Sequence, residues 1–237
     1  MTGITEVRKQ PGRSVDEPEV LEPPRASIRK AGLALGVVGS ALLVGYLLAT
    51  ALAPAVAANK LSWVLGRGLG IAAFLALNTL VCFGVWIRHP LRSRIGWPSP
   101  KDTLAIHASL GAATFALIAG HLTALALDPW AKIGWVGALV PWASSYRPTP
   151  VALGTLAVWT IVLVGFTARL AGRLGRARWL RIHRIAWLIW IASLLHGLTA
   201  GSDAMALRYV YAAAGAVVVA VWVSGRLIPP PLRRPAA

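Results

Sequence analysis

The stretch "HASLGAATFALIAGH", from His107 to His121, carries a histidine at each end and lies inside one long apolar segment, residues 103–127. A helix that crosses a bilayer needs about 20 mainly apolar residues, a length that this segment reaches. Ionisable side chains at membrane depth are rare, and they commonly mark functional sites. The two histidines are therefore the first candidate functional residues of the chain.

Other segments of the 237-residue chain have a similar length and character. They cover residues 31–56, 68–88, 150–170, 182–201 and 207–228. The chain is 57% hydrophobic and only 14% charged, which is not the composition of a soluble globular protein. We therefore predict an all-α integral membrane bundle of six transmembrane helices over residues 31–228. The polar residues 1–30 are expected to form a disordered cytoplasmic tail, and residues 229–237 a short cytoplasmic tail.

The net charge of +16 could indicate a nucleic-acid-binding protein, but the basic residues lie between apolar blocks, as in membrane proteins. Most of the 24 Lys and Arg residues fall in the N-terminal tail, the loops after the second and fourth spans, and the C-terminus. Because cytoplasmic segments are enriched in Lys and Arg, both termini are expected in the cytoplasm. We expect a multi-pass protein of the cell (plasma) membrane that contacts lipid and binds no nucleic acid.

A second segment with a histidine at each end, "HRIAWLIWIASLLH", runs from His183 to His196 in the fifth span. The third and fifth spans are expected to run in the same direction. His107 would then lie level with His183 near the cytoplasmic end, and His121 level with His196 near the outer end. Two imidazoles on facing helices can ligate one heme iron. We predict heme b at both levels, about 20 Å apart along the helix axis, with a single heme as the alternative.

The two spacings are not equivalent around a helix. At about 100° per residue, 14 residues bring His121 to within about 40° of His107, whereas 13 residues leave His196 about 140° from His183. A kink in the fifth span, or hemes that approach it from different sides, would accommodate this difference. Zinc or copper bound without a porphyrin, and histidines that only form hydrogen bonds between helices, are the alternative interpretations.

Residues near the histidines supply further candidates. Arg181 and Arg184 flank His183 and could pair with heme propionates, or they could only anchor the helix at the membrane surface. Three glycines near the histidines could let a flat macrocycle approach, or serve ordinary helix packing: Gly111, Gly120 and Gly197. His89, at the end of the second span, is interpreted as an interface residue. The loop "SSYRP" (144–148) could line an acceptor site with Asp203, although a loop-structure role is favoured.

With these residues in view, the chain resembles the ferric reductase-like transmembrane domain family, in particular its stand-alone actinobacterial-type branch. That family includes ferric reductases, the membrane core of NADPH oxidases and the heme-binding membrane subunit of bacterial methionine sulfoxide reductase systems. The resemblance rests on the 14- and 13-residue histidine spacings and on "WLRIHRIAWLIWIASLLHG" (179–197), "VPWASSYRP" (140–148) and "HGLTAGSD" (196–203). It implies that His107 and His183 hold a cytoplasmic-side heme, and His121 and His196 an outer one.

Reductases and oxidases of that family carry a flavin and nicotinamide domain after the last span, whereas here only "PPPLRRPAA" follows, and no nucleotide-binding fingerprint is found. We therefore expect an electron-transfer oxidoreductase component without its own flavin/NAD(P)H domain, with flavin only on a separate partner. Electrons would come from a separate flavoprotein or quinol and pass through bis-His heme to an extracytoplasmic acceptor. A non-catalytic heme-binding subunit of a larger redox complex and a solute transporter with histidine proton relays are the alternatives.

Overall fold

The computed structural model describes residues 24–202 and 204–229, and in this part of the chain every regular element is a helix. The helices are α1 (Pro24–Ala57), α2 (Leu61–Trp86), α3 (Pro90–Ile95), α4 (Pro100–Ala126), α5 (Gly134–Leu139), α6 (Pro148–Arg169), α7 (Ala171–Leu174), α8 (Arg176–His183), α9 (Ala186–Ala200) and α10 (Ala204–Leu227). The predicted all-α class is confirmed for these residues.

Five helical segments are long and apolar enough to cross a membrane: α2, α4, α6, the stretch Arg176–Ala200 that contains α8 and α9, and α10. They coincide with the second to sixth predicted spans and indicate a multi-pass membrane protein. The predicted first span falls within α1, which begins at Pro24 and whose described apolar part, Leu42–Ala57, is shorter. A sixth span and cytoplasmic termini therefore stay predictions. Most of the two expected tails, residues 1–23 and 230–237, lies outside the described residues.

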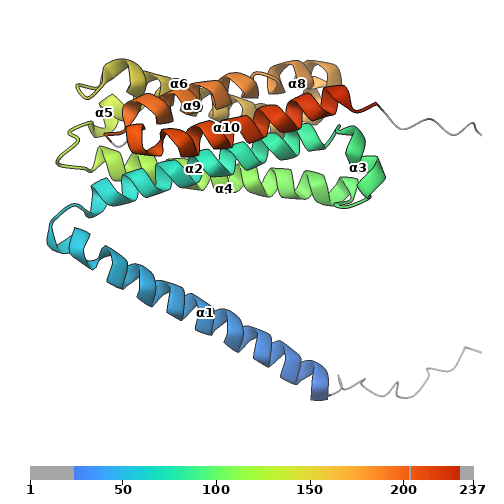
Figure 1. Ribbon diagram of the computed structural model, residues 1–237, viewed down its shortest axis with the longest axis horizontal. Helices are drawn as coiled ribbons and strands as arrows, with labels where there is room; N and C mark the ends of the chain where they lie inside the picture. Colours follow the sequence, from blue (N-terminus) through green and yellow to red (C-terminus); the bar gives the residue numbers. More distant parts are fainter. Residues whose placement is uncertain (1–23, 203, 230–237) are drawn as a thin grey trace, which may run out of the picture. The chain divides into compact units, whose positions relative to one another are not determined.

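The helices after residue 55 form one bundle in which α2, α4, α6, α9 and α10 run side by side (Figure 1). Helix α2 packs against α4, and α6 packs against α9. Helix α10 contacts both α2 and α9, which also contact each other, and so joins the two pairs. The predicted histidine ligands thus lie on both sides of the bundle: His107 and His121 on α4, His183 on α8 and His196 on α9.

Proline and capping side chains fix where the main helices begin. Pro100 and Pro148 occupy the first turns of α4 and α6, where the missing N–H costs no hydrogen bond. The Ser99 hydroxyl accepts a hydrogen bond from the N–H of Asp102 at the start of α4. The register of α4, and hence the level of its histidines, is set from this end.

The bundle core is apolar and lies between the two predicted histidine levels. Its buried cluster comes from α2, α6 and α9 and consists of Leu77, Ala157, Ile161, Val164 and Ile189. A buried hydrogen bond lies beside this cluster: the Trp190 indole N–H donates to Asn78 Oδ1 at 3.0 Å. Large apolar side chains on the outside of the spans, such as Phe166 (61% exposed) and Leu188 (63% exposed), present the surface that lipid would cover.

The fifth span is interrupted immediately after His183. Helix α8 ends there and α9 begins at Ala186, and the two residues between them have ψ angles of −18° and −19°. The backbone N–H groups of Ile185, Trp187 and Leu188 bond three residues back instead of four. Such 3₁₀ geometry turns about 120° per residue, which adds rotation in the direction that reduces the mismatch between His183 and His196.

Candidate functional site

The four predicted histidines lie in two pairs across the bundle. His107 of α4 faces His183 of α8 with 6.1 Å between ring centroids and 62° between ring planes. His121 of α4 faces His196 of α9 with 6.3 Å between centroids and 80° between planes. These are the two pairs expected from the sequence, and the interruption after His183 is part of what brings both rings of the fifth span toward α4.

Three of the four imidazoles are oriented by backbone carbonyls. Nδ1 lies 3.1 Å from Leu80 O in His107, 2.5 Å from Gly66 O in His121 and 2.8 Å from Pro150 O in His196. A carbonyl can only accept a hydrogen bond, so Nδ1 must carry the proton in each of these rings. Nε2 is then the nitrogen with the free lone pair, which is the arrangement common among metal-binding histidines.

Each of these carbonyls is followed four residues later by a glycine. The pairs are Leu80 and Gly84, Gly66 and Gly70, and Pro150 and Gly154. A Cβ added to the glycines of the last two pairs would lie 2.8 Å from ring atoms of His121 and His196, and one added to the first would lie 3.2 Å from His107. Because these glycines have no side chain, each imidazole can approach its carbonyl.

The glycines of α2 repeat the spacing of the α4 histidines. Gly70 and Gly84 are 14 residues apart, as are His107 and His121, so the antiparallel helices stay in register over both levels. The matching spacings are a signal that the sequence alone contains. Two of the glycines predicted to let a macrocycle approach have other neighbours: a Cβ at Gly120 would meet Leu69, and one at Gly197 would meet the Tyr211 ring. These two serve ordinary helix packing.

His183 is the exception among the four. Its Nδ1 is buried and has no hydrogen-bond partner among the described residues. The indole Nε1 of Trp179, one turn earlier in α8, is in the same condition. The two rings lie against each other, with centroids 5.1 Å apart and planes inclined by 35°. His183 is thus positioned by ring packing instead of by a hydrogen bond.

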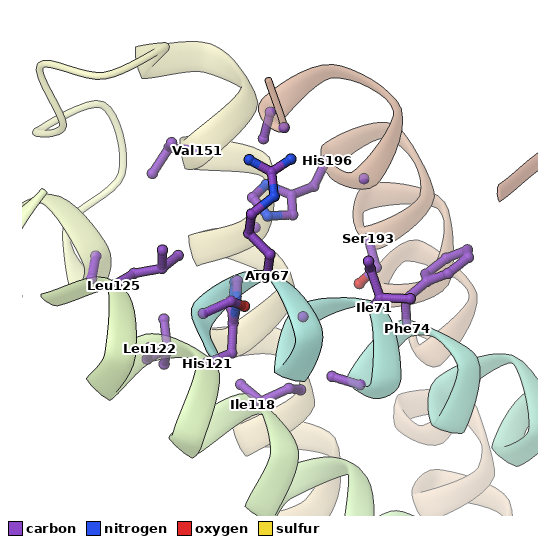
Figure 2. Close-up of a pocket in the computed structure, with 18 of the residues that line it drawn as sticks. Arg67, Ile71, Phe74, Ile118, His121, Leu122, Leu125, Val151, Ser193 and His196 are labelled. Atoms are coloured by element: carbon purple, nitrogen blue, oxygen red, sulfur yellow. The ribbon is translucent and has the colours of Figure 1, made fainter. Parts of the chain in front are cut away.

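A cavity of about 350 Å³ surrounds the His121–His196 pair. Its walls come from α2, α4, α6, α9 and α10, and most of the lining is apolar. Figure 2 shows His121, His196 and Arg67 gathered in this space, with Ile71, Phe74, Ile118 and Leu122 around them. The space lies between the α2–α4 and α6–α9 helix pairs and is open to both imidazoles.

Arg67 is a cavity residue that sequence reasoning did not select. Its guanidinium donates to Ser202 Oγ at 2.6 Å and lies 4.4 Å from the centroid of the Trp63 ring. The predicted second span, 68–88, begins just after Arg67, whereas α2 begins at Leu61 and Arg67 is its one charged residue. A charged residue inside an otherwise apolar span is a candidate functional residue, as the histidines are.

The predicted propionate partners, Arg181 and Arg184, lie at the other level of the bundle. Both side chains are exposed. Arg184 directly follows His183, in the interruption between α8 and α9. Among the described residues neither has a hydrogen-bond or ion-pair partner, so the structure does not tie them to the histidines. Their pairing with a ligand stays a prediction.

His89, which the sequence interpretation placed at an interface, is held by contacts within the protein. It is only 5% exposed, its Nδ1 accepts from the N–H of Leu91, and its Nε2 lies 3.1 Å from Ser224 Oγ. The ring also stacks on Trp86 with centroids 5.1 Å apart. Both nitrogens are therefore already used, and His89 joins α3 to α10.

The loop 144–148 fastens the end of α9. The Tyr146 hydroxyl donates to Ala200 O at 3.1 Å, and Arg147 donates to Thr199 O at 2.8 Å and Gly201 O at 3.0 Å. These bonds satisfy carbonyls at the C-terminal end of the helix that carries His196. The favoured loop-structure role thus matches the contacts, while Asp203 lies outside the described residues.

The described residues contain no group of three or more His, Cys, Asp or Glu side chains that could hold a metal ion by themselves. No family model, curated protein or solved structure matches the chain. The resemblance to the ferric reductase-like family therefore stays a prediction, and the functional argument rests on the geometry of the two histidine pairs.

Proposed function

We propose that the chain is a b-type cytochrome that holds heme b between the two imidazoles of each pair and passes electrons across the membrane. The observation that carries the proposal is the ring spacing. A metal ion between two imidazole nitrogens lies about 2 Å from each, and each nitrogen is about 1.1 Å from its ring centroid, so coaxial rings have centroids about 6.2 Å apart. The observed 6.1 and 6.3 Å agree with this value.

The donor set favours heme over a bare metal ion. Each level offers two imidazoles, and the described residues offer no third ligand. Zinc held by protein commonly has three or four protein ligands, whereas a porphyrin supplies four nitrogens and leaves only two axial positions to fill. Two imidazoles that hold one heme need not have parallel ring planes, so the inclinations of 62° and 80° are compatible with this role.

The protein's own contribution is orientation and burial. The carbonyls of Leu80, Gly66 and Pro150 hold three imidazoles in the tautomer that presents Nε2. The continuous helix α4 fixes the two levels about 20 Å apart, and the apolar core between them keeps water away. Bound heme would supply one-electron redox chemistry at iron. With both axial positions occupied by histidine, each site suits electron relay better than substrate binding.

The direction of transfer follows from the predicted topology. With both termini in the cytoplasm, the His107–His183 pair faces the cytoplasm and receives electrons from a separate flavoprotein or quinol. The His121–His196 pair then faces an extracytoplasmic acceptor. The resemblance to ferric reductase-like membrane domains supports the same order, because such domains carry electrons outward through paired hemes.

The test is an absorption spectrum of detergent-purified protein, made with ample heme supply, in the oxidised and reduced states. Two hemes per chain with low-spin, bis-histidine spectra are expected. His121→Ala and His196→Ala should each remove one heme, whereas His89→Gln, away from both pairs, should keep two. Protein that binds no heme would refute the proposal and favour the transporter alternative.

A further inference from the structure

The two histidine pairs are held unequally. We propose that His183 is the exchangeable ligand of the four, so that a small neutral ligand, such as carbon monoxide or free imidazole, enters at the His107–His183 pair and not at the His121–His196 pair. The inference rests on the proposed heme function and adds a ligand-binding site to it. One neutral ligand replaces another in the exchange, so no electron or proton is transferred.

The first support is the missing hydrogen bond. His121 and His196 both have Nδ1 on a helix carbonyl, at 2.5 and 2.8 Å, whereas the buried Nδ1 of His183 has no partner among the described residues. A hydrogen bond at this position fixes the ring and makes the imidazole a stronger ligand, and its loss typically costs about 10- to 100-fold in metal affinity. Of the four histidines, His183 would therefore hold a heme iron most weakly.

The second support is the backbone that carries His183. His107 and His121 lie within one continuous helix of 27 residues. His183, by contrast, is the last residue of an eight-residue helix and is followed at once by the 3₁₀ turn that leads into α9. A few residues at the end of an element are where backbone rotation is absorbed most easily. The backbone beside His183 can therefore rotate more easily than the continuous helix that carries His107 and His121.

The third support is the surroundings of the ring. Trp179 packs on His183, and its indole N–H is also buried without a partner. Buried donors without acceptors are unfavourable, so the position in which His183 faces His107 is the costlier one for these two side chains. No comparable penalty is found at His196, whose Nδ1 is bonded to Pro150 O.

The experiment is a carbon monoxide titration of the reduced, two-heme protein, followed by its absorption spectrum. One carbon monoxide bound per chain is expected, with half of the heme spectrum unchanged. The double variant His121→Ala/His196→Ala should keep one heme that binds carbon monoxide, and His107→Ala/His183→Ala should keep one that does not. Binding of none or of two per chain by the wild type, or binding only at the His121–His196 pair, would overturn the inference. Absence of heme from the wild type would instead refute the proposed function.

A gain of binding tests the same reasoning from the opposite direction. In Gly154→Ala the new Cβ lies 2.8 Å from the His196 ring and pushes it away from Pro150 O. Carbon monoxide binding should then rise from one to two per chain. Gly68→Ala is the matched control, because a Cβ there meets nothing within 4 Å, and it should still bind one. A Gly154→Ala protein that keeps both hemes and binds only one carbon monoxide would contradict the role given to the carbonyl.

Discussion

Replacement of Gly70 by alanine is the sharpest perturbation that the structure offers. The added Cβ would lie 2.8 Å from Cε1 and Nδ1 of His121, whereas ordinary contacts begin near 3.4 Å. The ring must therefore retreat by about 0.6 Å, and its hydrogen bond to Gly66 O is lost or stretched. Loss of such a bond costs about 10- to 100-fold in metal affinity, which corresponds to about 1.4–2.8 kcal/mol.

The same substitution should not weaken the fold of α2. Alanine is about 1 kcal/mol more favourable than glycine inside a helix, so the cost falls on ligand binding and not on helix formation. Gly68→Ala gains the same helix propensity on the same helix, but its Cβ meets open space. Comparison of the two variants thus separates the effect of contact with His121 from the effect of helix propensity.

The assay is heme content per chain together with the rate at which heme is lost to an excess of a heme-scavenging protein. For Gly70→Ala we expect loss from the His121–His196 site to be at least tenfold faster, with the other heme unaffected. Gly68→Ala should match the wild type. Equal heme content and equal loss rates in the two variants would show that the carbonyl and its glycine do not position His121.

Three further outcomes follow. Arg67→Gln should keep both hemes but lower the reduction potential of the His121–His196 heme by roughly 60 mV, a tenfold shift for one electron, because a nearby positive charge is removed; a redox titration with an unchanged potential would count against a role for Arg67. Asn78→Ala should lower the free energy of unfolding, measured by denaturant titration, by about 1–3 kcal/mol, because the buried Trp190 N–H loses its acceptor. Increasing ionic strength should leave the spectra of both hemes unchanged, since apolar helices enclose the sites, and a salt-dependent spectrum would indicate exposed hemes.

The helical class and the positions of five spans could be predicted because length and hydropathy almost suffice for membrane helices. The pairing of the histidines followed from their predicted depth in the membrane alone. Residues that are equally far along two spans running in the same direction lie at the same level. The 3₁₀ turn after His183 was foreseen only as a possible kink. Nothing in "HRIAW" is a proline or glycine that would mark it, and the packing of both α8 and α9 against α6 is not visible in the sequence.

The roles of individual glycines could not be predicted from the histidine helices. Gly120 and Gly197 stand beside histidines in sequence, but on a helix adjacent residues point in different directions. The glycines that contact His121 and His107 lie on α2, which is a neighbour in space, and finding them requires the register between two helices. Arg181 and Arg184 were favoured for a similar reason, nearness in sequence, while Arg67 reaches the cavity from α2.

The glycine beside each carbonyl has a physical explanation in the membrane setting. In a bilayer no water is available to hold the Nδ1–H of a histidine, and every helix carbonyl already accepts from the N–H four residues later. A carbonyl has a second lone pair, but the side chain at that later position obstructs the approach to it. Glycine removes the obstruction, so a helix can orient a histidine on its neighbour without losing a hydrogen bond of its own. His183, at the end of a short helix, has no such glycine beside it, and its Nδ1 is the one without a partner among the described residues.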